Sequence, residues 1–222
     1  MADVVEAVVP LSPAQIARFR VEGFLHDRAI LAPDDVAGFC GELGRLAVEG
    51  GAVPWTGPWV ASETGHGYAP VRYLAERSAP WKAFCADLGR RAAQLLGDQT
   101  AVLYEATGIL KPPQLGQSFP WHQDGAYYGP IDGHYVIANL YLDDVTPENG
   151  SLQVVPCSHR AALAHVERDG KKVVALDGTP VEPQAKAGDV VWFHLWTVHG
   201  SPPNHGSTPR RAVRLGYTSE QR

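Results

Sequence analysis

Residues 187–201 read Ala187-Gly188-Asp189-Val190-Val191-Trp192-Phe193-His194-Leu195-Trp196-Thr197-Val198-His199-Gly200-Ser201. The first three residues are a turn signal, and the apolar run that follows is typical of a buried β-strand. A second short strand-like run covers 197–199. We therefore expect a β-hairpin that carries His199 into the interior of a barrel.

Short strand-like runs fill the rest of the second half. Turn signals such as Thr146-Pro147-Glu148-Asn149-Gly150 and Asp177-Gly178 separate them. No helical pattern alternates with these runs, which argues against a parallel βαβ sheet and favours a sandwich or barrel. The expected strands are 101–107, 136–142, 151–155, 173–176, 189–193, 197–199 and 211–217.

The first half has helical patterns instead. Ser12-Pro13-Ala14-Gln15 has the residue types of a helix capping box, and Gly23 ends that segment. Two further amphipathic helices are expected from Pro33 to about 47 and from about Ser78 to 97. The sequence thus predicts a mainly β protein with flanking helices. We expect one domain over 1–222, with 1–97 as mostly helical support and 98–222 as the β core.

The composition favours a packed protein that binds small molecules. The 222 residues include 23 glycines and 18 prolines, which suits tight turns better than a helical bundle. The formal net charge is −5, and acidic and basic residues are interspersed, so no basic surface for nucleic acid is predicted. No obligate protein partner is evident.

Cysteine use and the N-terminal residues indicate a cytoplasmic location. Cys40, Cys85 and Cys157 are far apart and form no Cys-x-x-Cys pair, so neither a disulfide framework nor a structural zinc site is expected. The first residues carry acids where a signal peptide needs basic residues. No apolar run approaches the roughly 20 residues of a membrane span.

The stretch Trp121-His122-Gln123-Asp124-Gly125 holds the main chemical signal. In a strand, His122 and Asp124 would lie on the same face, with imidazole and carboxylate side by side. These are two of the three ligands in the 2-His-1-carboxylate triad of non-haem Fe(II) oxygenases, and His199 is the candidate for the third. His-x-Asp alone also fits a polar pair on a surface strand. The other nearby histidines are interpreted as surface or hydrogen-bonded side chains; they are His134, His159, His165, His194 and His205.

An arginine cluster follows the second histidine. Arg210, Arg211 and Arg214 lie in the run Pro209–Arg214, and Arg210 stands eleven residues after His199. An arginine beside an iron site can clamp a carboxylate bidentately, as required for a 2-oxo acid that supplies electrons to dioxygen. Arg210 and Arg214 share a strand face, whereas Arg211 is expected to point away. The spacing favours Arg210.

A series of short motifs fills the second half of the chain, within a match that runs in order from about residue 12 to 220. The motifs are Lys111-Pro112-Pro113, His122-Gln123-Asp124, Tyr127-Tyr128, Glu148–Leu152, Val155–His159, Gly188–Val191 and His199-Gly200-Ser201 through Arg210. Together they resemble the phytanoyl-CoA dioxygenase (PhyH) family of Fe(II)- and 2-oxoglutarate-dependent oxygenases. In that family's motif Pro-Gly-Ser-His, Cys157 stands in place of the glycine, which affects a turn and not the metal.

The resemblance implies both a fold and a set of ligands. The fold is a double-stranded β-helix, a cupin-like jelly roll, with N-terminal helices packed on one sheet and the jelly-roll core in 98–222. His122, Asp124 and His199 would hold iron. Arg210, assisted by Ser201, would bind the C5 carboxylate of 2-oxoglutarate. A further residue, Asn139, would line the co-substrate pocket.

The predicted activity uses Fe(II), 2-oxoglutarate and O2 to hydroxylate an unactivated C–H bond, with release of succinate and CO2. The substrate is expected to be a small secondary metabolite or amino-acid-like molecule, because no Lys/Arg patch suggests a coenzyme A site. Retention of Asp124 favours hydroxylation over halogenation, while desaturation, epimerisation and cyclisation stay open. Candidate substrate contacts are Tyr127, Tyr128, Trp55 and Trp59.

These residues could instead have purely structural roles, and the function also has an alternative. Tyr127 and Tyr128 would also serve as ordinary packing aromatics, and Trp55 and Trp59 as the packing of a connector between helices. The alternative function is a non-redox, cupin-like metal-dependent isomerase or a small-molecule binding protein. That alternative would leave Arg210 without a role.

Overall fold

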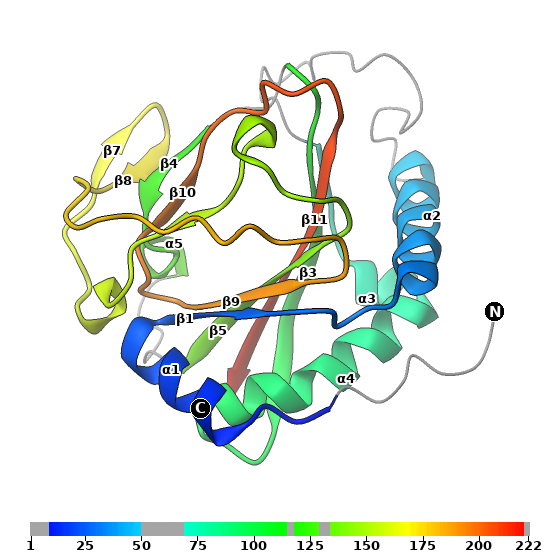
Figure 1. The fold of residues 1–222 in the computed structure, drawn as a ribbon, viewed down its shortest axis with the longest axis horizontal. Coiled ribbons are helices and arrows are strands. Elements are labelled where there is room, and N and C mark those ends of the chain that lie inside the picture. The colour runs from blue at the N-terminus through cyan, green and yellow to red at the C-terminus, as the bar shows by residue number, and fades with distance from the viewer. Residues whose placement is uncertain (1–8, 50–68, 115–117, 129–133, 220–222) are drawn as a thin grey trace.

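Two antiparallel sheets face each other, and helices cover the outer face of the larger sheet (Figure 1). The computed structural model describes residues 9–49, 69–114, 118–128 and 134–219. Its helices are α1 (Pro13–Glu22), α2 (Pro33–Glu49), α3 (Leu74–Arg77), α4 (Ala79–Leu96) and α5 (Gly125–Tyr128), with 3-10 turns at Pro147–Asn149 and Ser158–Arg160. Across the described ranges, no helix is both long and apolar enough to cross a bilayer.

The larger sheet has the strand order β1-β9-β5-β11-β3-β2, and the smaller sheet has the order β4-β10-β6. A separate hairpin is formed by β7 and β8. The bounds are β1 (Phe24–Asp27), β2 (Ala69–Val71), β3 (Ala101–Lys111), β4 (Phe119–His122), β5 (Tyr135–Tyr141), β6 (Gln153–Val154), β7 (Val166–Arg168), β8 (Lys171–Val173), β9 (Val190–His194), β10 (His199–Ser201) and β11 (Arg210–Ser219).

The three expected N-terminal helices are confirmed. At the start of α1, the Ser12 hydroxyl accepts a hydrogen bond from the backbone N–H of Gln15 at 3.3 Å, and the Gln15 side chain accepts one from the backbone of Ser12 at 2.9 Å. This is the capping box that the sequence indicates. Gly23 ends the helix with φ 78°, a left-handed conformation that favours glycine.

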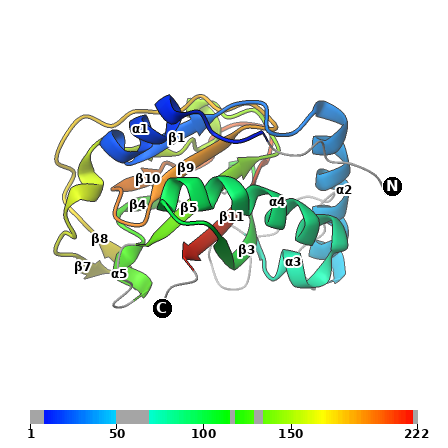
Figure 2. The same cartoon turned by 90° about the horizontal axis from the view of Figure 1, so that it is seen from below.

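Alternation along the central strands separates two cores. Val136, Ala138 and Leu140 of β5 belong to a buried cluster with the helices, whereas Tyr135 and Ile137 belong to a second cluster between the sheets. Figure 2 shows α4 lying across the outer face of the large sheet. This arrangement is the predicted mainly β fold with helices packed on one sheet.

Several elements differ from the sequence prediction. The segment before residue 97 also contributes strands, because β1 pairs with β9 and β2 pairs with β3 in the large sheet. The strand expected at 173–176 is displaced to Lys171–Val173, and β7 pairs with it. β1 ends in a polar residue, Asp27, which is buried in an ion pair with Arg91.

The turn that departs from the family pattern carries strain. Cys157 has φ 65°, in the left-handed region that costs a residue with a Cβ about 1–2 kcal/mol. Replacing Cys157 with glycine removes this cost but adds freedom to the unfolded chain. We expect Cys157→Gly to raise the free energy of unfolding by about 0.5–1 kcal/mol in urea denaturation. Cys157→Ala keeps the Cβ and is the matched control; an equal gain in both variants would contradict the strain argument.

Candidate metal centre and co-substrate pocket

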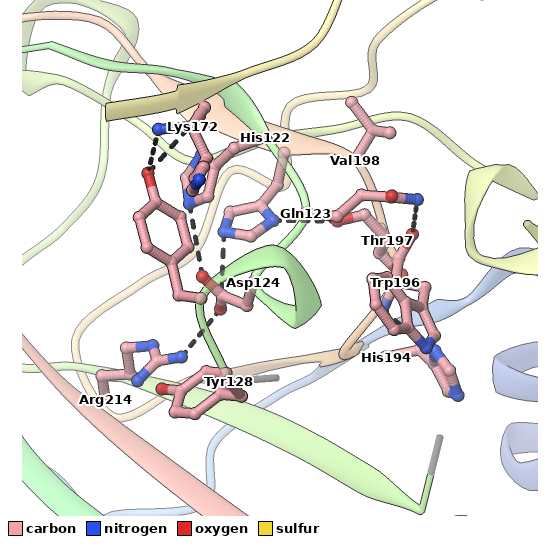
Figure 3. A network of polar contacts seen from close by, with 12 residues as sticks. His122, Gln123, Asp124, Tyr128, Lys172, His194, Trp196, Thr197, Val198 and Arg214 are labelled. Carbon is pink, nitrogen blue, oxygen red and sulfur yellow. Dashed lines mark hydrogen bonds and ion pairs between the residues drawn. The ribbon is translucent and has the colours of Figure 1, made fainter. Parts of the chain in front are cut away.

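Three buried side chains converge where the small sheet closes. His122 ends β4 and His199 begins β10, and the two residues are direct partners in the antiparallel pairing. Asp124 lies between their imidazoles, with Oδ1 3.3 Å from Nε2 of His122 and Oδ2 3.7 Å from Nε2 of His199. The candidate ligand atoms all lie within 4.8 Å of one another. Figure 3 shows Asp124 next to His122, with Arg214 on its other side.

Backbone carbonyls orient both imidazoles for metal binding. Nδ1 of His122 lies 2.7 Å from the carbonyl oxygen of Pro120, and Nδ1 of His199 lies 2.9 Å from that of Thr197. An Nδ1–H donated to each carbonyl leaves Nε2 free as a ligand atom. Burial, together with the neighbouring His122, lowers the pKa of His199 to about 4, so its imidazole is neutral at pH 7. Neutral imidazole is the form that binds metal.

The placement of Asp124 corrects the expectation that it shares a strand with His122. The strand ends at His122, and Asp124 lies in the turn before α5. The turn is held by the buried Gln123 side chain, which donates to the carbonyl oxygens of Ala161 at 2.8 Å and Trp196 at 2.6 Å. A sharp turn, and not the pleat of a strand, therefore directs the carboxylate between the imidazoles.

Glycine is required directly after Asp124. A Cβ added to Gly125 would lie 2.4 Å from the Trp196 ring, closer than real contacts allow. The backbone N–H of Gly125 also donates to the carbonyl oxygen of Leu195 at 3.1 Å. The close approach of this turn to the β9–β10 connection thus explains the glycine in Trp121–Gly125.

A second cluster of buried polar groups lies on the inner face of β3 and β11. Lys111 and Arg210 are partners in the strand register, and both side chains are buried. Nζ of Lys111 donates to the hydroxyl of Ser201 at 2.6 Å, and Nη1 of Arg210 donates to the carbonyl oxygen of Gly150 at 3.0 Å. Burial, and secondarily Arg210, lower the pKa of Lys111 to about 6.

This cluster fits the carboxylate of a 2-oxo acid. The Nε atom of Arg210 is buried and has no hydrogen-bond partner among the described residues, and the same holds for the hydroxyl of Ser151. Neither Lys111 nor Arg210 forms an ion pair with a carboxylate of the described chain. The buried charge of Arg210 without a counter-charge is costly, so an anionic ligand beside it would satisfy the free donor, offset the charge and favour the protonated form of Lys111.

The structure separates the three arginines of the cluster. Arg211 points away from the interior and pairs with Asp143. Arg214 faces the interior, as predicted, but its Nη2 lies 2.8 Å from Oδ2 of Asp124 and its Nη1 pairs with Glu105. Arg214 is therefore already neutralised by two carboxylates, whereas Arg210 has its charge available. Arg210 is also the arginine that the spacing of eleven residues after His199 predicts.

Of the two other expected co-substrate residues, one joins the basic cluster and the other lies opposite Arg214 in the strand register. Ser201 contacts Lys111, and Asn139 faces the interior on β5 with a buried Oδ1 that has no hydrogen-bond partner among the described residues. Lys111 itself was not predicted, since its position before Pro112-Pro113 reads as a turn. Its placement opposite Arg210 depends on the pairing of β3 with β11, which the sequence does not show.

A cavity of about 420 Å³ opens beside the metal ligands. His122, Asp124 and Arg214 line it, together with the candidate substrate contacts Tyr127 and Tyr128. The Tyr128 hydroxyl donates to Glu105 at 2.6 Å, which fixes that ring at the wall. Trp55 and Trp59, the other two candidates, lie outside the described residues.

Fold and site together define a class of enzyme. A buried 2-His-1-carboxylate cluster, on a jelly roll with a basic pocket for a dicarboxylate, is the arrangement of Fe(II)- and 2-oxoglutarate-dependent dioxygenases. A family model for phytanoyl-CoA dioxygenase (PhyH) matches residues 19–212. The chain belongs to this family, and the donor atoms of the buried cluster and of the basic pocket fit iron as the metal and 2-oxoglutarate as the co-substrate.

Curated relatives with sequence similarity act on small molecules. The methylphosphonate hydroxylase of Gimesia maris is 34% identical over 132 residues, which cover 58% of this chain and 49% of that protein. The ectoine dioxygenase of Bordetella bronchiseptica is 25% identical over 236 residues, covering 94% and 76%. The L-proline trans-4-hydroxylase of Streptomyces griseoviridis is 34% identical over 152 residues, covering 56% of each chain. The alignment with the first of these thus spans about half of that relative's length.

Solved structures confirm the double-stranded β-helix. EctD from S. alaskensis, bound to 2-oxoglutarate and 5-hydroxyectoine, has a TM-score of 0.79 and 24% identity, covering 98% of this chain and 79% of that one. The carbocyclase SnoK from nogalamycin biosynthesis has a TM-score of 0.77 and 22% identity, covering 94% and 84%. At this level of identity, the likeness establishes the fold.

Proposed function

We propose that this enzyme hydroxylates a C–H bond of a small molecule. The balanced reaction consumes the substrate, 2-oxoglutarate and O2, and yields the alcohol, succinate and CO2. The observation that carries the proposal is the buried cluster of His122, Asp124 and His199, whose first two members line the cavity, on a fold that also holds the basic pocket at Arg210. The cluster can hold a metal, and each flanking space has its own group of binding residues.

The side chains of the cluster and of the basic pocket have two tasks. His122, Asp124 and His199 hold iron, and Arg210, Lys111 and Ser201 hold the far carboxylate of 2-oxoglutarate. When bound there, iron and 2-oxoglutarate supply the oxidising power that activates dioxygen.

The walls of the site position the substrate and exclude water. Arg214 fixes one oxygen of Asp124, and Tyr128 is fixed in turn by Glu105. Asn139 offers a buried amide oxygen opposite Arg214 in the strand register, and Tyr127 stands edge-on to His122, with ring centroids 5.7 Å apart. These contacts give the reacting C–H bond a defined place beside the metal.

The names of the relatives support a small polar substrate. They refer to methylphosphonate, ectoine and L-proline, all compact molecules, and a further relative is a probable hypophosphite dioxygenase from Stutzerimonas stutzeri. A cavity of about 420 Å³ is of the size that takes such molecules. We therefore propose a compact polar metabolite and not an acyl-CoA thioester.

Binding of 2-oxoglutarate tests this proposal directly. Under anaerobic conditions, adding 2-oxoglutarate to the Fe(II) protein is expected to produce a weak visible charge-transfer band. Admitting oxygen is then expected to release succinate, slowly without substrate and faster with it. A non-redox cupin-like protein would show neither band nor calorimetric binding of 2-oxoglutarate, and that result would overturn the proposal.

Product mass separates hydroxylation from the other oxidations. SnoK is a carbocyclase and SnoN an epimerase, and both share this fold. Hydroxylation adds one oxygen atom, desaturation or ring closure removes two hydrogens, and epimerisation leaves the mass unchanged. We expect the product to carry one atom of oxygen from O2, which mass spectrometry with labelled dioxygen detects.

A further inference from the structure

We propose that the substrate carries an oxyanion, which Arg72 and Lys171 bind in the cavity beside the metal ligands. This inference rests on the proposed oxygenase function and narrows its substrate class to small anions. The oxyanion is a carboxylate or a phosphonate, since both present a pair of adjacent anionic oxygens that can accept charge-assisted hydrogen bonds from these cations.

The charged side chains around the cavity favour an anionic substrate. Arg72, Lys171 and Arg214 line it, and Asp124 is the carboxylate among its lining residues. The charge of Arg214 is offset by Asp124 and Glu105. Within the described ranges, neither Arg72 nor Lys171 has an ion-pair partner, although both lie against the same cavity.

The β7–β8 hairpin directs Lys171 toward the cavity. The hydroxyl of Tyr127 accepts a hydrogen bond from the backbone N–H of Lys172 at 2.8 Å, which ties β8 to α5. Successive strand residues point in opposite directions. Lys171 thus lines the cavity and donates to the carbonyl oxygen of Ser118 at 3.2 Å, while Lys172 pairs with Glu167 at 3.6 Å on the hairpin.

The two basic pockets are distinct. Lys111 and Arg210 form the co-substrate pocket and do not line the cavity, whereas Lys171 and Arg72 do. Phe119 stands near both, with its ring centroid 5.3 Å from Nζ of Lys111 and 5.9 Å from Nζ of Lys171. Since 2-oxoglutarate occupies the first pocket and the metal, the cations of the second pocket are left for the substrate.

An anionic group bound by Arg72 and Lys171 would fix the orientation of the substrate in the cavity. Its charged end would contact Arg72 and Lys171, while its C–H bonds face His122 and Asp124 between the rings of Tyr127 and Tyr128. Arg72 is exposed and Lys171 is half-buried, so water solvates both in the free enzyme. A neutral substrate would displace that water without offsetting the two charges, whereas an anionic group offsets them. The substrate therefore has a compact aliphatic part attached to an acidic group.

Matched acid and neutral pairs test this inference. The probes are short carboxylates with their amides and short alkylphosphonates with their diesters, each added to the iron-loaded enzyme with saturating 2-oxoglutarate. We expect only acids to accelerate succinate release above the rate without substrate. The carboxylate and phosphonate arms identify which oxyanion is preferred. Equal acceleration by a neutral partner, or acceleration by no acid of either arm, would overturn the inference.

Variants then assign the effect to the two cations. Lys171→Gln and Arg72→Gln are each expected to raise the KM for the accelerating acid about tenfold to a hundredfold, the loss of one charge-assisted hydrogen bond. Lys172→Gln removes the same charge from the adjacent position and is expected to behave like the wild type. If Lys171→Gln instead raised the KM for 2-oxoglutarate by the same factor, Lys171 would belong to the co-substrate pocket and the inference would be wrong.

The result also separates this inference from the proposed function. If 2-oxoglutarate binds and is slowly turned over but neutral molecules accelerate it, the oxygenase proposal stands and the anion inference falls. If 2-oxoglutarate produces no band and no heat of binding, the proposed function itself falls, and the inference with it.

Discussion

Replacing His199 with alanine is expected to abolish succinate release from 2-oxoglutarate. His199 supplies one of the three ligand atoms of the buried cluster, and its Nε2 faces Asp124 at 3.7 Å. Substituting residues that merely orient metal ligands typically costs 10–100-fold in metal affinity or activity, so removing a ligand is expected to cost more than roughly 100-fold. The measurements are succinate release and the iron content of the purified protein.

Thermal unfolding gives a readout independent of turnover. Fe(II) binds the folded wild-type protein and is expected to raise its Tm, and a chelator should reverse the rise. His199→Ala is expected to show neither change. His205→Ala is the control, because this side chain is exposed and away from the cluster. Full turnover or an intact metal-dependent Tm shift in His199→Ala would show that the ligand assignment is wrong.

Replacing Arg210 with methionine is expected to remove high-affinity binding of 2-oxoglutarate. Arg210 is buried, and its Nε has no partner in the described chain, so its donors are available to a carboxylate. Each hydrogen bond to a charged group contributes about 1.5–3 kcal/mol, so losing a bidentate pair predicts a Kd increase of about 100-fold or more. Calorimetric titration measures this. Arg90→Met, on the exposed side of α4, is the control and should bind normally.

Because of Lys111, we expect the number of protons taken up on binding of 2-oxoglutarate to depend on pH. With a pKa of about 6, Lys111 is mostly neutral at pH 7.5, and a carboxylate bound beside it favours the charged form. Binding of 2-oxoglutarate should therefore take up close to one proton at pH 7.5. The uptake should shrink below pH 6, where the free enzyme is already protonated. Titrations in buffers of different ionisation enthalpy measure it, and Lys111→Met should remove it.

The convergence of the three candidate ligands was predictable because the sequence around them marks each one locally. His122 and Asp124 are two positions apart, and His199 follows a strand signature that the structure confirms as β9. The alternation of side chains along a strand correctly predicted that Arg211 points away from the interior. The turn at Asp124 was not predictable, because it depends on Gln123 bonding to the distant carbonyl of Trp196.

Elements defined by long-range pairing were missed. β1 is four residues long and half polar, and its strand conformation comes from pairing with β9. Its buried Asp27 is tolerated because Arg91 pairs with it and Trp192 donates to it at 3.2 Å. Lys111 was missed for the same reason, since only the register of β3 against β11 places it opposite Arg210.

The positions of the two basic pockets bear on how readily this enzyme could change substrate. Arg210 and Lys111 lie on paired strands of the six-stranded sheet, so altering them disturbs the scaffold. Arg72 follows the short edge strand β2, and Lys171 lies on the separate β7–β8 hairpin. Substitutions at these two rim positions carry little folding penalty. Substitutions at Arg72 and Lys171 could therefore change the substrate preference, in evolution or in a selected library. The residues proposed to bind the metal and 2-oxoglutarate would stay unchanged.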